Sequence, residues 1–248
     1  MNEQIRHKRL LELLDVKGIL STPEIIAHFD ISPATARRDI TKLSQQGKLS
    51  KMRNGVEKLS PSRHRIPPVL ENISDEKQRI AMAAAKLCND KESVILTCGS
   101  TMMALGAALC KQKLQIITNY LPLANYLIEH EHDNVVIMGG QYNKNQAITL
   151  SLSESGENAF AANIMFTSAK GLTTSGLYKT DMLIASSEQR ILQRAEKLIV
   201  LVDSSKLGKT VGMLFTELKN IDVVITGKEA DINIINSLRE KGLNIILA

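Results

Sequence analysis

The sequence has little of what marks exported, disulfide-stabilised or membrane-embedded proteins. Its three cysteines are odd in number and form no Cys-x-x-Cys pair, which argues against a disulfide framework and against a zinc site. No apolar run approaches the ~18 residues that a membrane-spanning helix needs. The N-terminal stretch MNEQIRHKRLLELLD carries charges throughout, unlike a signal peptide. These absences predict a cytoplasmic protein with reduced thiols, no metal site and no membrane partner.

Positive charge is concentrated near the N-terminus. Residues 1–65 contain 13 Lys and Arg against 7 Asp and Glu, a net charge of +6, whereas the whole chain of 248 residues carries +5 and the remainder therefore −1. A basic segment joined to a near-neutral body is typical of a nucleic-acid-binding head. A solvated basic surface without a partner explains the charge equally well, so the motifs have to decide.

The basic segment first predicts three helices. Residues 3–16 have a helical apolar pattern that ends at Gly18. The sequence STPE at residues 21–24 has the spacing of a capping box, in which a Ser hydroxyl and a Glu carboxylate bond the free amides at a helix start. Ser32 and Pro33 suit the N-cap and first position of a third helix.

The third predicted helix turns a cationic face away from its core. Ala36, Ile40 and Leu43 recur at i, i+4 and i+7 and so form the buried stripe. The exposed face is small, polar and positively charged, which suits a DNA major groove, where arginine contacts phosphates or the O6 and N7 atoms of guanine. The residues of this helix predicted to contact DNA are Ser32, Ala34, Thr35, Arg37, Arg38, Thr41 and Lys42.

A basic hairpin is predicted directly after this helix. The sequence GKLSKMRNGVEKL contains Asn54-Gly55, a signal for a type I′ turn. Lys51 and Arg53 are expected to lie along the phosphate backbone of DNA. Three helices and this wing predict a winged helix-turn-helix domain over residues 1–58. A small helical domain that binds protein is the alternative, but the caps, the outward arginines and the wing together favour DNA.

The rest of the chain reads as a linker and an α/β domain. Residues 59–73, which begin LSPSRHRIPP, are rich in Pro, Ser and Arg and lack periodicity. Over residues 74–248, helical stretches alternate with the β-rich runs SVILT, LQIIT, NVVIM, NIMFT, KLIVLV, DVVIT and LNIIL. This alternation predicts a mostly parallel sheet with helices on both faces. Because one winged head has a small interface, we expect the α/β domain to form a dimer or tetramer.

Ligands of such sheets bind outside the carboxyl ends of the strands, so the residues after each run are candidates for a binding site. Gly99-Ser100-Thr101 follows the first run and opens a helix, whose amides and dipole favour an anion. Lys206 is a candidate counter-ion for a phosphate, and Asp203 is a candidate to orient that lysine or a sugar hydroxyl. Simple helix capping and a surface ion pair are the alternatives at these places. The candidate residues for binding a small anionic effector are Gly99, Ser100, Thr101, Thr118, Asn119, Gly139, Gly140, Lys170, Lys179, Asp203 and Lys206.

Long stretches of the chain resemble one family of bacterial regulators. ISPATARRDITKLSQQGKL is similar to the DNA-binding head of the DeoR-type transcription regulators. TNYLPLANYLI, IMGGQYNK, KGLTTSGLYKTDML, LVDSSK and GMLF resemble their sugar-phosphate sensor domain, whose fold is similar to ribose-5-phosphate isomerase. The resemblance extends to members that repress L-ascorbate utilisation genes in enteric bacteria. It therefore implies a repressor that binds operator DNA and is relieved by L-ascorbate 6-phosphate.

The chain also departs from the family pattern. Thr97 stands where many members have Asp, and Ala36 where many have Ile. Ser168, Ala169 and Lys170 replace the acidic residues of the related isomerases, so the carboxylates needed for proton transfer are expected to be absent. This predicts a regulator without catalytic residues. A regulator or activator that senses another sugar phosphate, and an isomerase- or deaminase-like enzyme, are the alternatives.

The implied ligand has two anionic ends, the phosphate and the acidic enediol ring. We expect Lys170 or Lys179 to face the ring while Lys206 and the Gly99 turn hold the phosphate.

Overall fold

The computed structural model describes residues 2–46, 48–58, 73–151 and 161–248. The chain divides into two compact units, Met1–His64, here called the head, and Arg65–Ala248, here called the body. The predicted linker lies outside the described residues except for Ile73, which is buried in the core of the body. The exact domain boundaries therefore stay a prediction. Among the described residues, none of the helices has the length and apolar character of a membrane span.

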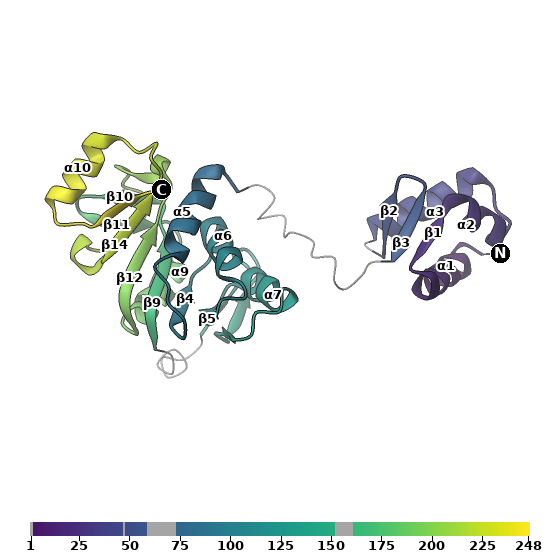
Figure 1. Cartoon of the computed structure of the whole chain (residues 1–248), viewed down its shortest axis with the longest axis horizontal. Helices are drawn as coiled ribbons and strands as arrows, with labels where there is room; N and C mark the ends of the chain where they lie inside the picture. The colour runs from purple at the N-terminus through teal and green to yellow at the C-terminus, as the bar shows by residue number, and fades with distance from the viewer. Residues whose placement is uncertain (1, 47, 59–72, 152–160) are drawn as a thin grey trace. The chain divides into compact units, whose positions relative to one another are not determined.

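The head contains three helices and a three-stranded sheet (Figure 1). Its elements are α1 (Glu3–Lys17), β1 (Ile19–Ser21), α2 (Thr22–Phe29), α3 (Pro33–Gln45), β2 (Leu49–Met52) and β3 (Gly55–Lys58). The middle strand, β3, pairs antiparallel with both β1 and β2. The three predicted helices and the hairpin are confirmed, whereas β1 was not predicted.

The predicted caps form as expected. At α2, the Ser21 side chain accepts from the amide of Glu24, and the Glu24 carboxylate accepts from the amide of Ser21 at 2.8 Å. At α3, Ser32 Oγ accepts from the amide of Thr35. These bonds satisfy amides that a helix start would otherwise leave free. The Ser32 cap therefore fixes where α3 begins, and with it which residues lie on the exposed face of that helix.

The hairpin turn differs from the predicted one. Met52 pairs with Gly55, so the loop residues are Arg53 and Asn54, and neither has the positive φ that a type I′ turn requires. Gly55 is a strand residue instead. A Cβ at Gly55 would lie 2.2 Å from the carbonyl oxygen of Leu20, so the glycine permits the close approach of β1 and β3.

One charged residue, Asp39, is buried where α1 meets α3. The core around it is apolar and consists of Leu10, Leu14, Leu20, Ile25, Phe29, Ala36, Ile40, Leu43, Leu49 and Val56. Asp39 is 3% exposed and accepts from Arg6 Nε at 2.5 Å and Arg6 Nη2 at 3.1 Å, and its Oδ1 lies 3.0 Å from His7 Nε2. Burial acts to raise the pKa of Asp39, but the hydrogen bonds and charges of Arg6 and His7 outweigh it and hold this pKa below its ordinary value. The carboxylate therefore joins α1 to α3.

The body is built on a seven-stranded sheet in which every pair of neighbours is parallel (Figure 1). Its spatial order is β15-β14-β12-β9-β4-β5-β6. These strands are β4 (Ser93–Leu96), β5 (Gln115–Thr118), β6 (Val135–Ile137), β9 (Ala162–Ser168), β12 (Ala195–Leu201), β14 (Val223–Thr226) and β15 (Ile245–Leu247). Each of the seven predicted β-rich runs contributes one strand, so the predicted sheet is confirmed.

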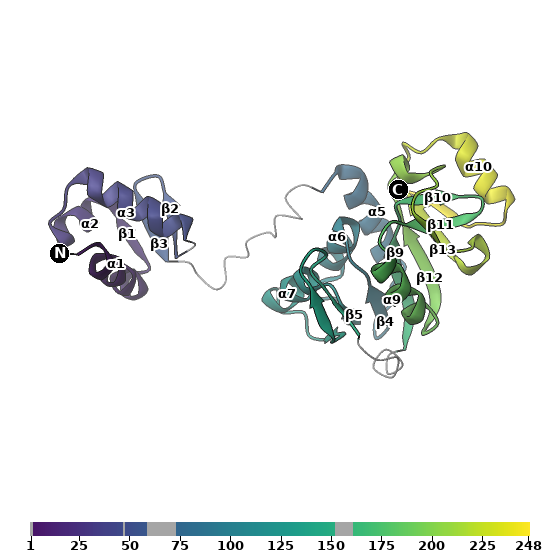
Figure 2. The same ribbon diagram turned by 180° about the vertical axis from the view of Figure 1, so that it is seen from behind.

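Helices cover both faces of this sheet, as predicted. The helices are α5 (Asp75–Ala85), α6 (Ser100–Leu109), α7 (Leu121–Glu129), α9 (Met182–Leu192) and α10 (Ile232–Glu240). Val94 and Leu96 pack on the side of α5, α6 and α7, whereas Ile95 between them packs on the side of α9 and α10. Seen from behind, α9 lies in front of the sheet (Figure 2). The two cores follow from the alternation of side chains along each strand.

Two small antiparallel sheets were not predicted. A hairpin joins β7 (Gln141–Asn143) to β8 (Ile148–Leu150), and a second sheet has the order β10 (Gly171–Thr173), β11 (Gly176–Lys179), β13 (Met213–Thr216). Short 3₁₀ turns cover Ser204–Lys206 and Leu218–Asn220. These pieces lie in connections of the large sheet.

The Asp39 contacts predict an acid-sensitive head. Asp39→Asn should destabilise the opening of α1 and α3 by about 1–3 kcal/mol at pH 7, because it leaves Arg6 and His7 without their buried carboxylate. A lowered folded-state pKa contributes stability that is complete above the ordinary Asp pKa of about 3.9 and is lost as the pH falls through the folded-state value. Amide hydrogen exchange of the full chain at pH 7 and pH 3 measures both effects, and the difference between variant and wild type should shrink at pH 3.

Asp15→Asn is the matched control, since Asp15 has an exposed side chain that pairs with Lys58. It should change the opening free energy by less than about 0.5 kcal/mol. Equal protection of α1 and α3 in Asp39→Asn and wild type at pH 7 would contradict the role of Asp39.

Candidate functional site

The first candidate site lies at the carboxyl edge of the parallel sheet, where the strand order reverses. From β4 the chain continues outward to β5 and β6, and from the neighbouring β9 it continues outward in the other direction to β12, β14 and β15. A cavity of about 510 Å³ opens there, lined by residues that follow β4, β9 and β12. Ligands of open α/β sheets bind at such a reversal, and the volume suits a small molecule.

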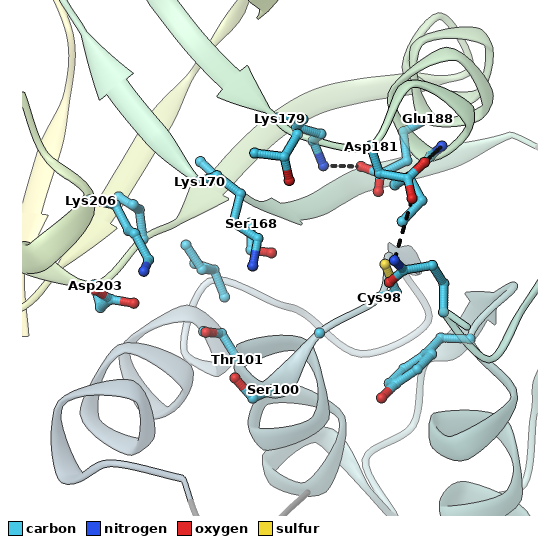
Figure 3. Close-up of a pocket in the computed structure, with 18 of the residues that line it drawn as sticks. Cys98, Ser100, Thr101, Ser168, Lys170, Lys179, Asp181, Glu188, Asp203 and Lys206 are labelled. Carbon is cyan, nitrogen blue, oxygen red and sulfur yellow. Dashed lines mark hydrogen bonds and ion pairs between the residues drawn. The ribbon is translucent and has the colours of Figure 1, made fainter. Parts of the chain in front are cut away.

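One end of the cavity is formed by the start of α6. Gly99 is the N-cap, with φ at +121°, and no side chain among the described residues caps this helix. By contrast, Ser74 caps α5 and Asp181 caps α9. The first amides of α6 therefore have no side-chain acceptor, and the residues that carry them line the cavity together with the hydroxyls of Ser100 and Thr101 (Figure 3). Free amides and the helix dipole make this end suited to an anion.

Two lysines border the start of α6. Lys206 lines the cavity as predicted, on the loop after β12. Lys77, in the first turn of α5, was not predicted, and its Nζ donates to Ser100 Oγ at 3.2 Å. Its neighbour Glu76 accepts from the amide of Ser204 at 2.6 Å and so holds the loop of Lys206 on α5. A lysine in the polar first turn of a helix is common, so the sequence does not indicate that Lys77 lies at the cavity. Its position there follows from the packing of α5 against α6.

The other end of the cavity contains a buried ion pair. Lys179 Nζ, 7% exposed, donates to Glu188 Oε2 at 2.5 Å and to Thr167 Oγ1 at 2.8 Å, and it lies 4.7 Å from the centre of the Phe215 ring. Glu188 is 3% exposed and also accepts from Thr167 Oγ1 at 2.7 Å. The sequence reasoning missed Glu188. The signal was present, because Glu188 lies between Ala185 and Ile191 on the buried stripe of α9.

Three carboxylates line the cavity, of which Asp203 was predicted and Asp181 and Glu188 were not. Ser168, Ala169 and Lys170 do replace acidic residues after β9. Asp181 is used as the cap of α9, where it accepts from the amides of residues 183 and 184. Asp203 accepts from the hydroxyl of Ser205.

The thiol of Cys98 lies in the same wall as Glu188 (Figure 3). Burial, with the nearby negative charge of Glu188, raises the pKa of Cys98 to about 11. The group is therefore a protonated thiol at neutral pH and is no nucleophile.

The cavity brings together seven of the eleven predicted effector residues: Gly99, Ser100, Thr101, Lys170, Lys179, Asp203 and Lys206. The other four do not line it. Thr118 is buried and donates to the carbonyl of Leu96, and Asn119 Nδ2 donates to the carbonyl of Thr149. A Cβ at Gly140 would lie 2.1 Å from the carbonyl oxygen of Leu150, so this glycine permits the close approach of β8. A Cβ added at Gly139 would meet no atom within 4 Å. Strand ends thus supply both ligand-facing and structural polar groups.

The exposed face of α3 is the second candidate site. Ser32, Ala34, Arg37, Arg38 and Lys42 are exposed, and Thr35 and Thr41 are half-buried. Arg53 is exposed in the hairpin turn. The predicted DNA-contacting residues therefore share one accessible region of helix and wing.

Contacts between side chains tie the wing to α3. Lys51 Nζ donates to Thr41 Oγ1 at 2.8 Å, and Thr41 Oγ1 donates to the carbonyl of Arg37 at 2.8 Å. Lys42 is paired with Glu3 of α1. Arg38 has no ion-pair partner among the described residues, which leaves its guanidinium available to an external acceptor.

Comparisons with known proteins find matches to both the head and the body. The family model described as DeoR-like helix-turn-helix domain matches residues 6–62, and the one described as DeoR C terminal sensor domain matches residues 72–228. The HTH-type transcriptional regulators UlaR of Shigella sonnei and Escherichia coli are 52% identical over 249 residues, covering 99% of this chain and 99% of each relative. Among solved structures, ribose 5-phosphate isomerase A of Methanocaldococcus jannaschii is 21% identical with a TM-score of 0.40, covering 53% of each chain.

Lys77 offers a test of the anion end. Lys77→Gln should weaken the binding of inorganic phosphate to the full chain by about 1–2 kcal/mol, or roughly 5- to 30-fold, because a charge-assisted bond to the anion is lost. Isothermal titration calorimetry measures the dissociation constant. Lys86→Gln, an exposed lysine at the other end of α5, is the control and should leave it unchanged. A wild-type dissociation constant in Lys77→Gln would remove Lys77 from the site.

Proposed function

We propose a specific task for this chain, which belongs to the DeoR family of helix-turn-helix transcriptional regulators: it represses genes for L-ascorbate utilisation until L-ascorbate 6-phosphate binds in the body. Regulators that share one name are 52% identical to this chain over nearly their whole length. This full-length similarity supports one specialised task within the family. The head binds operator DNA through α3 and the wing. A regulator of bacterial genes acts where the DNA lies, in the cytoplasm, and we expect the body to pair heads as a dimer or tetramer.

The observation that carries the effector proposal is the uncapped start of α6 beside Lys77 and Lys206. A phosphate monoester there gains the amides, the hydroxyls and two ammonium groups at once. The remaining cavity extends away from this end toward Lys179, which leaves room for the ring of a small organic phosphate (Figure 3).

Arg38, one of the two exposed arginines of α3, is proposed to read bases. Arg38→Ala should cost about 1–3 kcal/mol of specific operator binding and relax the preference at one base pair. Lys51→Ala should weaken all DNA alike and make the salt dependence shallower by about one unit, because a phosphate contact is lost. Fluorescence anisotropy with operator and scrambled duplexes at several salt concentrations separates the two effects.

Lys113→Ala, an exposed lysine of the body, serves as the control and should match wild type on both duplexes. Operator binding by Arg38→Ala as tight as that of wild type would show that α3 does not read the operator.

The effector is tested by release from DNA. L-Ascorbate 6-phosphate should lower the affinity of the full chain for its operator, whereas L-ascorbate and inorganic phosphate at the same concentration should not, because each lacks one half of the ligand. A ligand shifts such an equilibrium only by its differential affinity for the two states. The readout is operator binding titrated against each compound. Release by D-ribose 5-phosphate but not by L-ascorbate 6-phosphate would keep a sugar-phosphate sensor and replace its effector.

A further inference from the structure

The two ends of the effector cavity differ in chemistry. The α6 end offers mostly donors, namely amides, hydroxyls and the ammonium groups of Lys77 and Lys206, and its one carboxylate, Asp203, is bonded to Ser205. The opposite end offers a buried donor, Lys179, directly bonded to a buried acceptor, Glu188 (Figure 3). A ligand that fills the cavity therefore meets a site rich in cations at one end and a mixed donor–acceptor pair at the other.

Lys179 retains one N–H group for a ligand. An ammonium group has three donors, and the described hydrogen-bond partners of Lys179 are Glu188 Oε2 and Thr167 Oγ1, with the Phe215 ring as a weaker contact 4.7 Å away. The third donor belongs to a side chain that lines the cavity and is almost fully withdrawn from water. An acceptor oxygen of a ligand is the group that satisfies it.

Glu188 likewise retains an acceptor. Its Oε2 accepts from both Lys179 and Thr167, whereas its Oε1 has no hydrogen-bond partner among the described residues. The carboxylate is 3% exposed and lines the cavity. Among the described residues, Oε1 is not one of the buried side-chain atoms left without a partner, so it is open to the cavity, where a ligand hydroxyl can donate to it.

We propose that Lys179 and Glu188 together read the enediol of the effector, an inference that rests on the function proposed above. The ring carries two oxygens on adjacent carbons, and at neutral pH one of them has lost its proton while the other, on C2, remains a hydroxyl. The ionised oxygen accepts from Lys179, and the C2 hydroxyl donates to Glu188. The phosphate lies at the start of α6.

This pairing explains selection against other phosphates. An ordinary sugar hydroxyl brings no negative charge to Lys179, and inorganic phosphate does not extend to either residue. A site built around buried polar groups rejects analogues that leave those groups unpaired. The pair therefore acts as a specificity determinant, separate from the general attraction of the α6 end for phosphate.

The first test replaces the pair by apolar residues of similar size. In the full-length variant Lys179→Met/Glu188→Leu the charge of the pair stays zero, and buried ion pairs tolerate such replacement well, so the body should unfold at a wild-type temperature. Calorimetry should show L-ascorbate 6-phosphate binding roughly 10- to 150-fold weaker, the range for one charge-assisted bond, with inorganic phosphate unchanged. Glu240→Gln, an exposed carboxylate at the end of α10, is the matched control and should leave both dissociation constants unchanged.

The second test isolates Glu188. Wild type should prefer L-ascorbate 6-phosphate over its 2-O-methyl derivative by more than about 10-fold, because the methyl group removes the donor to Glu188. Glu188→Gln should reduce this preference to within about 3-fold, because the Gln carbonyl takes the bonds from Lys179 and Thr167 and leaves an NH₂ donor in the place of Oε1. Both ligands carry the same charge, so a general electrostatic change cancels in the ratio.

The outcomes separate this proposal from the function on which it rests. Wild-type affinity for L-ascorbate 6-phosphate in the double variant, equal loss of both ligands in it, or an unchanged methyl preference in Glu188→Gln would each overturn the role of the pair alone. Failure of wild type to bind L-ascorbate 6-phosphate would overturn the proposed effector and the pair's role together.

Discussion

The parallel pairing of β4 with β9 is the contact on which the cavity depends. Residues 94–96 pair with residues 164–166, although a large part of the sensor sequence separates them. The pairing places the Gly99 turn beside the end of β9, where a Cβ on Gly99 would lie 3.5 Å from Ser168 Oγ. Because both strands are buried on both faces, a shift of one residue would exchange the two sets of core side chains and displace the start of α6.

The positive charge of the cavity results from this arrangement of strands and does not reflect the net charge of the body. Residues 66–248 carry a net charge of −1, yet four lysines line the cavity: Lys77, Lys170, Lys179 and Lys206. The three carboxylates there are engaged, Asp181 as a helix cap, Glu188 with Lys179, and Asp203 with Ser205. Within the described residues the other three lysines have no carboxylate partner. The local excess of positive charge therefore attracts an anion although the body as a whole does not.

Local signals in the sequence predicted the strands, helices and caps, and they failed where the fold joins distant segments. Each β-rich run became a strand, because a parallel strand buried on both faces reads as a continuous apolar run. Gly55 was predicted to be a turn residue, but a glycine is required there because β1 packs closely against β3. No local sequence pattern shows that contact. Lys77 was missed for the same reason. Asn119 and Gly140 were taken as ligand-facing because a strand end alone does not tell a binding group from a structural one.

The first turn of α5 has a distinct position between the two functions of the chain. Helix α5 is the first helix of the described part of the body, so the covalent path between the two sites passes through it. In the same turn Lys77 bonds the start of α6 and Glu76 bonds the amide of Ser204, one residue on each side of the anion end. A phosphate at that end must share Lys77 with Ser100 or take it from Ser100. A phosphate at that end therefore changes the contacts of the first helix of the body, and a ligand shifts an equilibrium only through such differences in its contacts between two states.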